Sequence, residues 1–149
     1  MRVSLKATYG ILAALDLALH NGSAPVQSKT IAKRQAIPLR FLEQVLNTMK
    51  QGGLVDSLRG AQGGYTLRKK PVDISLAEIV ETLDGPLVPA VNGSATRRLR
   101  GQLRPNALLG SVWERVHQAE LSVLSTVTLK ELAERQQQLE QQKTLMYHI

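Results

Sequence analysis

Polar and basic side chains at two places in the first half of this chain could contact nucleic acid. Arg40 and Gln44 lie four residues apart in PLRFLEQVLNTMKQ, so a helix would place them on one face. Arginine pairs with guanine and glutamine with adenine in the major groove. Arg59 follows in RGAQGG, where small neighbours would let its guanidinium enter a narrow A·T minor groove. Together these residues indicate readout of duplex DNA.

The other residue types favour no catalytic or metal chemistry. The chain has no cysteine, which excludes disulfides, thiolate metal sites, cysteine-bound iron–sulfur clusters and thiol nucleophiles. Its three histidines, His20, His117 and His148, stand on separate predicted elements without metal-ligand spacing. The glycines of residues 60–64 are not followed by the Lys-Ser/Thr of a phosphate loop. We therefore expect no cofactor, no metal and no enzyme.

The elements that position the two candidate segments follow the order of a winged helix. Apolar periodicity predicts a helix over residues 4–20, a short helix through residues 30–35 capped by Ser28, and a third helix over 39–51. Ile37-Pro38 breaks the chain between the last two. Residues 54–58 and 65–67 are predicted strands joined by the glycine-rich segment that carries Arg59. The predicted fold is mainly α, a winged helix-turn-helix with a two-stranded β-hairpin wing plus a long C-terminal dimerisation helix.

Positive charge is concentrated in the same part of the chain. The formal net charge is +7, and residues 1–70 hold 11 Lys or Arg against 3 acidic residues. This distribution is typical of a polyanion-binding module. Two alternatives to DNA binding stay open. The positive charge could serve only solubility, or the winged helix could bind a protein.

The second half of the chain divides into a loop and two helices. A capping box at Ser75 opens a short helix that ends near residue 84, and residues 86–105 form an irregular segment with four arginines. A long helix is predicted from residue 106 to about 126. A second capping box at Thr128 opens a helix that fades into QQQLEQQK. The predicted organisation is a winged helix-turn-helix domain at 1–85, a flexible loop at 86–105, and a dimerisation helix with a C-terminal helix at 106–149.

The long helix carries a wide apolar stripe that needs a burial partner. The simplest partner is the same helix of a second chain, related by a twofold axis, with Trp113 as an anchor. Alternatively, Trp113 packs onto the first helix of its own chain. The predicted interface residues are Leu109, Val112, Trp113, Val116 and Leu124.

Several motifs make nearly the whole chain resemble the Rrf-two family of bacterial winged-helix transcriptional regulators. The motifs are Met1-Arg2 with Tyr9, Phe41-Leu42-Glu43-Gln44, Gly53-Leu54-Val55, Arg59-Gly60 before Gly63-Gly64-Tyr65, Trp113, and residues 127–132. The family includes iron–sulfur regulators, a nitric-oxide sensor and a cysteine-metabolism repressor. The resemblance implies a homodimeric transcription factor whose long helix forms the dimer interface.

DNA contacts are expected at particular residues, most of which the resemblance assigns. Recognition-helix contacts are expected at Pro38, Arg40, Phe41, Glu43, Gln44 and Thr48. Wing contacts are expected at Arg59 and Gly60, and phosphate contacts at Arg2, Lys6, Ser28 and Lys50. Family members often have a small polar residue where this chain has Pro38 and Arg40, so a different operator is expected.

The chain departs from the family that it resembles in the segment where some members bind an iron–sulfur cluster. Those members use three cysteines there, and this chain has none. Arg97, Arg98, Arg100 and Arg104 occupy the segment instead. They could bind an anionic effector, an acidic partner or DNA phosphates, or simply face water.

Together these features predict a cytoplasmic homodimer that binds a palindromic DNA operator, most simply as a repressor and without an iron–sulfur cluster. The partners expected are double-stranded DNA, a second copy of the chain and an unidentified small-molecule or protein effector, with no membrane. The alternative is a winged-helix interaction module that binds a partner protein rather than DNA.

Overall fold

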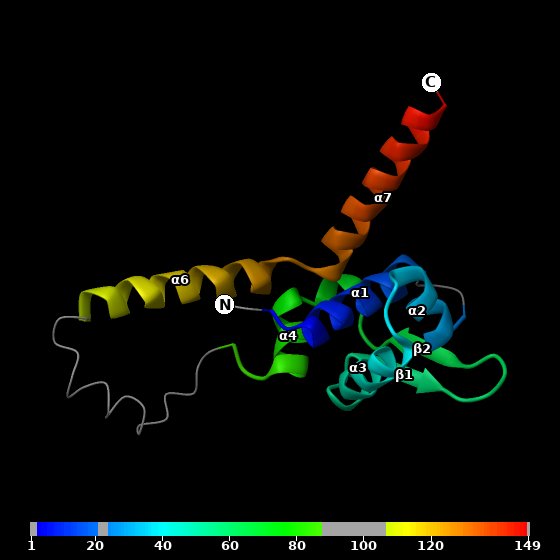
Figure 1. The fold of residues 1–149 in the computed structure, drawn as a ribbon, viewed down its shortest axis with the longest axis horizontal. Helices are drawn as coiled ribbons and strands as arrows, with labels where there is room; N and C mark the ends of the chain where they lie inside the picture. Colours follow the sequence, from blue (N-terminus) through cyan, green and yellow to red (C-terminus); the bar gives the residue numbers. More distant parts are fainter. Residues whose placement is uncertain (1–2, 21–23, 88–106, 149) are drawn as a thin grey trace.

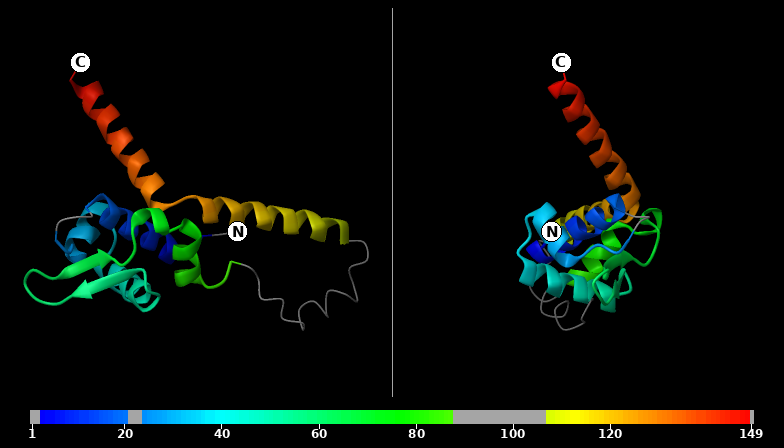
Figure 2. Two further views of the ribbon diagram at one scale, coloured as in Figure 1. Left: turned by 180° about the vertical axis from the view of Figure 1, so that it is seen from behind. Right: turned by 90° about the vertical axis from the view of Figure 1, so that its right-hand side faces the viewer.

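The computed structural model describes residues 3–20, 24–87 and 107–148, which form one body and two projecting helices (Figure 1). In chain order the elements are α1 (Leu5–Leu19), α2 (Ser28–Gln35), α3 (Leu39–Gln51), β1 (Val55–Leu58), β2 (Gly64–Leu67), the 3-10 helix η1 (Pro71–Asp73), α4 (Leu76–Asp84), α6 (Ala107–Thr126) and α7 (Leu129–Tyr147). The body contains α1 to α4 and the hairpin. Helices α6 and α7 leave it in different directions, as the rear and side views also show (Figure 2).

The first two helices begin at different kinds of residue. Ser4 caps α1, since its side-chain oxygen accepts from the backbone N–H of Ala7 at 3.0 Å. The prediction that Ser28 caps the second helix is wrong. Gln27 precedes α2 without a side-chain cap, and Ser28 is the first helical residue. The helix therefore starts earlier than the sequence pattern indicated.

A tight turn joins α2 to α3 and creates the predicted helix-turn-helix. Ala36 ends α2 in the left-handed conformation with φ 53°, Ile37 is buried, and Pro38 precedes α3 in an extended conformation. Proline disfavours helical geometry at the residue before it, which separates the two helices here. Helix α3 has the predicted bounds, and its buried face consists of Leu42, Val45, Leu46 and Met49.

The hairpin is a two-stranded antiparallel sheet in which Val55 pairs with Leu67 and Leu58 with Gly64. Both predicted strands are confirmed, with their starts shifted by one residue. Val26 forms an isolated bridge with Tyr65 beside this sheet, which ties the segment before α2 to the hairpin. The close approach requires a glycine, because a Cβ on Gly64 would lie 2.5 Å from the Val26 backbone. The 3-10 turn η1 was not predicted.

The start of α7 belongs to the core of the body. Leu129 is fully buried, and its N–H donates to the carbonyl of Ile74 at 2.9 Å. Ser75 and Thr128 form a further isolated bridge, and both cap the helices that follow them, as their capping boxes predicted. The last helix is longer than expected, because it continues through the glutamine run to Tyr147.

These elements confirm the predicted fold class, a mainly α winged helix-turn-helix with a two-stranded wing and a long helix after it. None of the helices within the described ranges is long and apolar enough to span a membrane. Most of the segment 86–105, including its four arginines, lies outside the described residues.

Candidate nucleic-acid interface

Helix α3 turns a polar face to solvent. Arg40, Glu43 and Gln44 are exposed, and 58% of Phe41 is accessible. The opposite face is in the core, so apolar burial fixes which side chains point outward. The side chains predicted to contact bases therefore lie together on one accessible helix surface.

Thr48 and Pro38 lie at the borders of this surface. Thr48 is half-buried, and its hydroxyl donates to the backbone carbonyl of Gln44 at 3.1 Å. This bond engages the hydroxyl within its own helix. Pro38 is exposed as the N-cap residue of α3, so it stands at the entrance to the helix, as predicted.

The tip of the wing presents Arg59 and Gly60, both exposed. Gly60 has φ 108°, and a Cβ at this position would have no atom within 4 Å, so backbone conformation rather than space explains the glycine. Gly63 is constrained by space, because its Cβ would lie 2.2 Å from the carbonyl oxygen of Leu58. The tip is thus a tight turn that presents a guanidinium with few bulky neighbours.

The wing and the start of α2 enclose a groove of about 390 Å³. Ser28 and Lys29 line it from α2, and Arg59 and Gly60 line it from the wing. The side-chain amide of Gln27 donates to the carbonyl of Ala61 at 3.4 Å across this region. The geometry places the predicted phosphate contact Ser28 beside the predicted wing contacts.

Several cations of the basic half are neutralised inside the chain. Arg68 makes hydrogen bonds of 3.0 Å and 2.7 Å to Oδ1 of Asp56, and this contact raises the pKa of Arg68 above its ordinary value. Lys69 pairs with Glu78. Among the described residues up to position 70, the exposed cations that have no acidic partner are Lys6, Lys29, Lys33, Arg40, Lys50, Arg59 and Lys70.

The predicted phosphate contacts are not all gathered at one place. Ser28 lies beside the wing, and Lys50 is exposed in the last turn of α3. Lys6 is exposed in the first turn of α1, which lies at the end of the body away from the wing tip (Figures 1 and 2). Arg2 lies outside the described residues.

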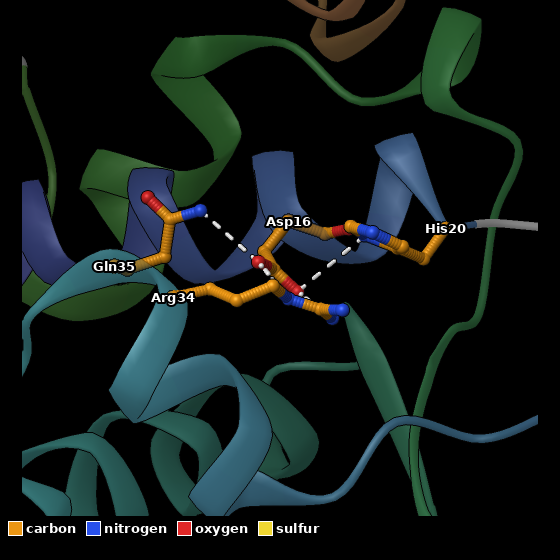
Figure 3. Close-up of polar contacts among 4 residues, drawn as sticks. All are labelled: Asp16, His20, Arg34 and Gln35. Atoms are coloured by element: carbon orange, nitrogen blue, oxygen red, sulfur yellow. Dashed lines mark hydrogen bonds and ion pairs between the residues drawn. The ribbon is translucent and has the colours of Figure 1, made fainter.

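A buried ionic cluster between α1 and the end of α2 was missed in the sequence. Asp16 on α1 is 1% exposed and accepts from Nε and Nη2 of Arg34 at 3.0 Å and 2.7 Å. The side-chain amide of Gln35 donates to Asp16 at 3.0 Å, and Nδ1 of His20 lies 2.8 Å from the Asp16 carbonyl oxygen (Figure 3). The available signal was a carboxylate on the apolar face of the first predicted helix.

The predicted dimerisation residues leave apolar surface open on α6. Leu109, Val112, Trp113 and Val116 are exposed, and Leu124 is half-buried. Two thirds of Trp113 is accessible, and it lines a groove together with Val80 and Asp84 of α4. Val3 and the C-terminal half of α6 line a mainly apolar groove of about 500 Å³.

The side chains of this protein do not fit the iron–sulfur cluster that some members of the family it resembles bind. Such clusters need thiolate ligands, and the sequence contains no cysteine. Histidine and carboxylate side chains also form no metal-binding group of three or more within the ranges that the structure describes.

Comparison with known proteins agrees with the fold. Residues 3–135 match the Rrf2 (Rrf-two) family, which is described as iron-dependent transcriptional regulators. The chain is 36% identical over 132 residues to a Synechocystis protein named as an HTH-type transcriptional regulator, slr0846, covering 89% of this chain and 87% of that one.

Solved structures of bacterial regulators also resemble this chain. The cysteine regulator CymR of Bacillus subtilis superposes with a TM-score of 0.73 at 32% identity, covering 91% of this chain and 98% of that one. The T. potens regulator IscR superposes with a TM-score of 0.74 at 36% identity, covering 91% and 88%.

Proposed function

Because the chain belongs to the Rrf2 family of transcriptional regulators, we propose that it is a sequence-specific DNA-binding regulator that acts as a homodimer on a palindromic operator. The observation that carries the proposal is the accessible face of α3, where Arg40 and Gln44 lie side by side with their helix packed on the core. A bacterial regulator of this kind works in the cytoplasm.

Helix α3 supplies the direct readout in the major groove. Arg40 is suited to a guanine, and Gln44 to the N6 and N7 positions of an adenine. Glu43 accepts from the amino group of a cytosine, and the exposed ring of Phe41 suits a thymine methyl group. Thr48 and Pro38 border this contact surface. Each good bidentate pair contributes about 1–3 kcal/mol of discrimination.

The wing and the neighbouring cations position the helix on the duplex. Arg59 enters the adjacent minor groove, where a narrow A·T tract concentrates negative potential. Ser28 and Lys50 contact phosphates, and Gly60 lets the wing backbone approach the duplex closely. Arg2 and Lys6 contact phosphates from the start of the chain. Such contacts set affinity and register without reading sequence.

The homodimer is supported by the apolar face of α6. A second copy would bury the stripe that contains Leu109, Val112, Trp113, Val116 and Leu124. Two α3 helices about 34–36 Å apart would then contact successive major grooves of one operator. In this arrangement residues 1–85 form the DNA-binding domain, 86–105 form the loop, and 106–149 supply the dimerisation helix and the C-terminal helix, which Leu129 anchors in the body.

The proposed regulator is a repressor that responds to a small-molecule or protein effector without an iron–sulfur cluster. The absence of cysteine separates it from those relatives that bind a cluster through thiolates. The arginines of residues 97–104 are candidates for contact with an anionic effector or an acidic partner.

Selection of bound duplexes from a random pool tests the proposal. A palindromic consensus with half-sites about one helical turn apart is expected, with affinity falling about 10³-fold or more between 50 and 200 mM salt for 6–10 phosphate contacts. An unselective pool, combined with a partner protein retained at high salt, would instead support the interaction-module alternative.

A further inference from the structure

Asp16 is the only buried charged residue in the described part of the chain. Its carboxylate accepts three hydrogen bonds from two consecutive side chains, Arg34 and Gln35 (Figure 3). We call these three residues the Asp16 clamp. A buried carboxylate is costly unless it is paired and hydrogen-bonded, and here both oxygens have donors.

The clamp acts at the end of α2 that leads into α3. Arg34 and Gln35 are the last two residues of α2. Ala36, Ile37 and Pro38 alone separate them from the first residue of α3. A shift of this helix end would therefore change the direction from which α3 starts.

The other contacts that hold α2 are apolar packing along the helix and a backbone bridge before it. It has eight residues, and only Ile31 and Ala32 are buried. Its other end is held by the bridge between Val26 and Tyr65, next to the wing. The apolar packing of Ile31, Ala32 and the following Ile37 is not directional, whereas the bidentate Arg34 pair fixes both distance and angle at the helix end.

We propose that Asp16 is a positioning residue for DNA readout, which acts through Arg34 and Gln35 to hold α2 and thereby set the orientation at which α3 meets the bases. This inference rests on the proposed function. It also assigns Arg34 to the clamp, so that its charge is neutralised by Asp16 rather than by a phosphate.

The test must separate positioning from simple stabilisation. Replacing a buried ion pair by apolar residues of similar volume is often neutral for stability, whereas removing one partner leaves an unpaired charge. The double variant Asp16→Leu/Arg34→Met therefore removes the clamp while retaining a packed core. Arg34→Lys keeps the charge but loses the bidentate geometry.

Two controls complete the design. Lys33→Ala removes one exposed cation beside the clamp, and Val80→Ala weakens the core at a fully buried position on α4. For each variant, the dissociation constant is measured for the duplex that the wild type selects and for a scrambled duplex. The measurements are made at a temperature where circular dichroism shows that every variant is folded.

The double variant is expected to lose at least about tenfold in the ratio of selected to scrambled binding, the discrimination carried by one bidentate base contact. Arg34→Lys should lower the ratio in the same direction. Lys33→Ala should leave the ratio unchanged, because the loss of a surface charge affects both duplexes equally. Val80→Ala should lower the melting temperature and leave the ratio unchanged.

A folded double variant with the wild-type ratio would overturn the inference while leaving the proposed function intact. If the double variant does not fold, Arg34→Lys decides, and an unchanged ratio there overturns the inference. A wild-type protein that selects no duplex sequence overturns the proposed function and this inference with it.

Discussion

Helices α3 and α6 are both amphipathic, but they leave opposite faces exposed. The apolar face of α3 is covered by its own chain, and its accessible face carries Arg40 and Gln44. On α6 the apolar residues themselves face solvent, with Trp113 66% exposed. An exposed polar surface can contact a ligand directly, whereas an exposed apolar stripe needs a second surface to bury it. The comparison therefore separates the region that we propose contacts DNA from the region that we propose a second copy completes.

The largest expected effect comes from placing a charge in the α6 stripe. Trp113→Asp should convert the dimer to a monomer, because a large aromatic anchor is replaced by a carboxylate that would be buried without a partner. Affinity for a palindromic duplex should fall about 100-fold or more, since the two half-sites no longer bind as one unit. Sedimentation velocity and gel shift measure the two effects.

Leu145→Asp provides the matched control. Leu145 is 67% exposed near the end of α7, so it has the accessibility of Trp113 without lying in the predicted interface. We expect no change in mass or affinity. If both variants stay dimeric, α6 is not the dimer contact, and dimerisation does not explain why the apolar face of α6 is exposed.

The next effect concerns the α3 surface. Gln44→Ala should reduce discrimination at one base pair of each half-site by about 1–3 kcal/mol while the protein remains dimeric and folded. Repeating the duplex selection with the variant measures the loss as relaxed preference at that position. Lys50→Ala is the control, for which uniform weakening and a smaller salt dependence are expected. A selection that is unchanged for Gln44→Ala would mean that Gln44 does not contact the bases.

A smaller, more local effect is expected at the wing. Arg59→Ala should weaken binding to duplexes with A·T pairs beside the half-sites more than binding to random duplex, because a narrow minor groove attracts the guanidinium. The loss on the A·T duplex is expected to be about tenfold, measured by gel shift at fixed salt. Equal losses on both duplexes would make Arg59 a phosphate contact.

The fold was largely predictable because its signals are local. The capping residues Ser4, Ser75 and Thr128, the break at Pro38 and the glycines around Arg59 each specify structure within a few residues. Errors arose at two helix boundaries. Ser28 failed as a cap, and α7 extends beyond the periodic pattern that predicted it.

In the candidate site, too, the features that depend on local sequence were predictable. The outward face of α3 follows from helical period, so Arg40 and Gln44 were placed correctly on an accessible surface. The pairing of Asp16 with Arg34 joins residues 18 positions apart, and no local pattern indicates which cation a buried carboxylate will meet. For this reason the count of basic residues in the first half of the sequence included Arg34, although Asp16 neutralises its charge.

The smallest expected effect tests the turn that links the clamp to α3. Ala36 has φ 53°, a conformation that costs an L-residue about 1–2 kcal/mol and glycine far less. Ala36→Gly relieves this strain but adds freedom to the unfolded chain, which offsets about 0.4–1 kcal/mol. The net expectation is a stabilisation of about 0.5 kcal/mol, seen as a slightly higher denaturant midpoint with an unchanged slope.

The Ala36→Gly variant also tests whether the turn before α3 acts independently of α6. Because Ala36 lies in the body and far along the chain from α6, dimer mass should not change. A variant that is less stable than the wild type would show that Ala36 makes contacts outweighing its backbone strain. A changed base preference would show instead that this turn sets the orientation of α3 together with the residues that precede it.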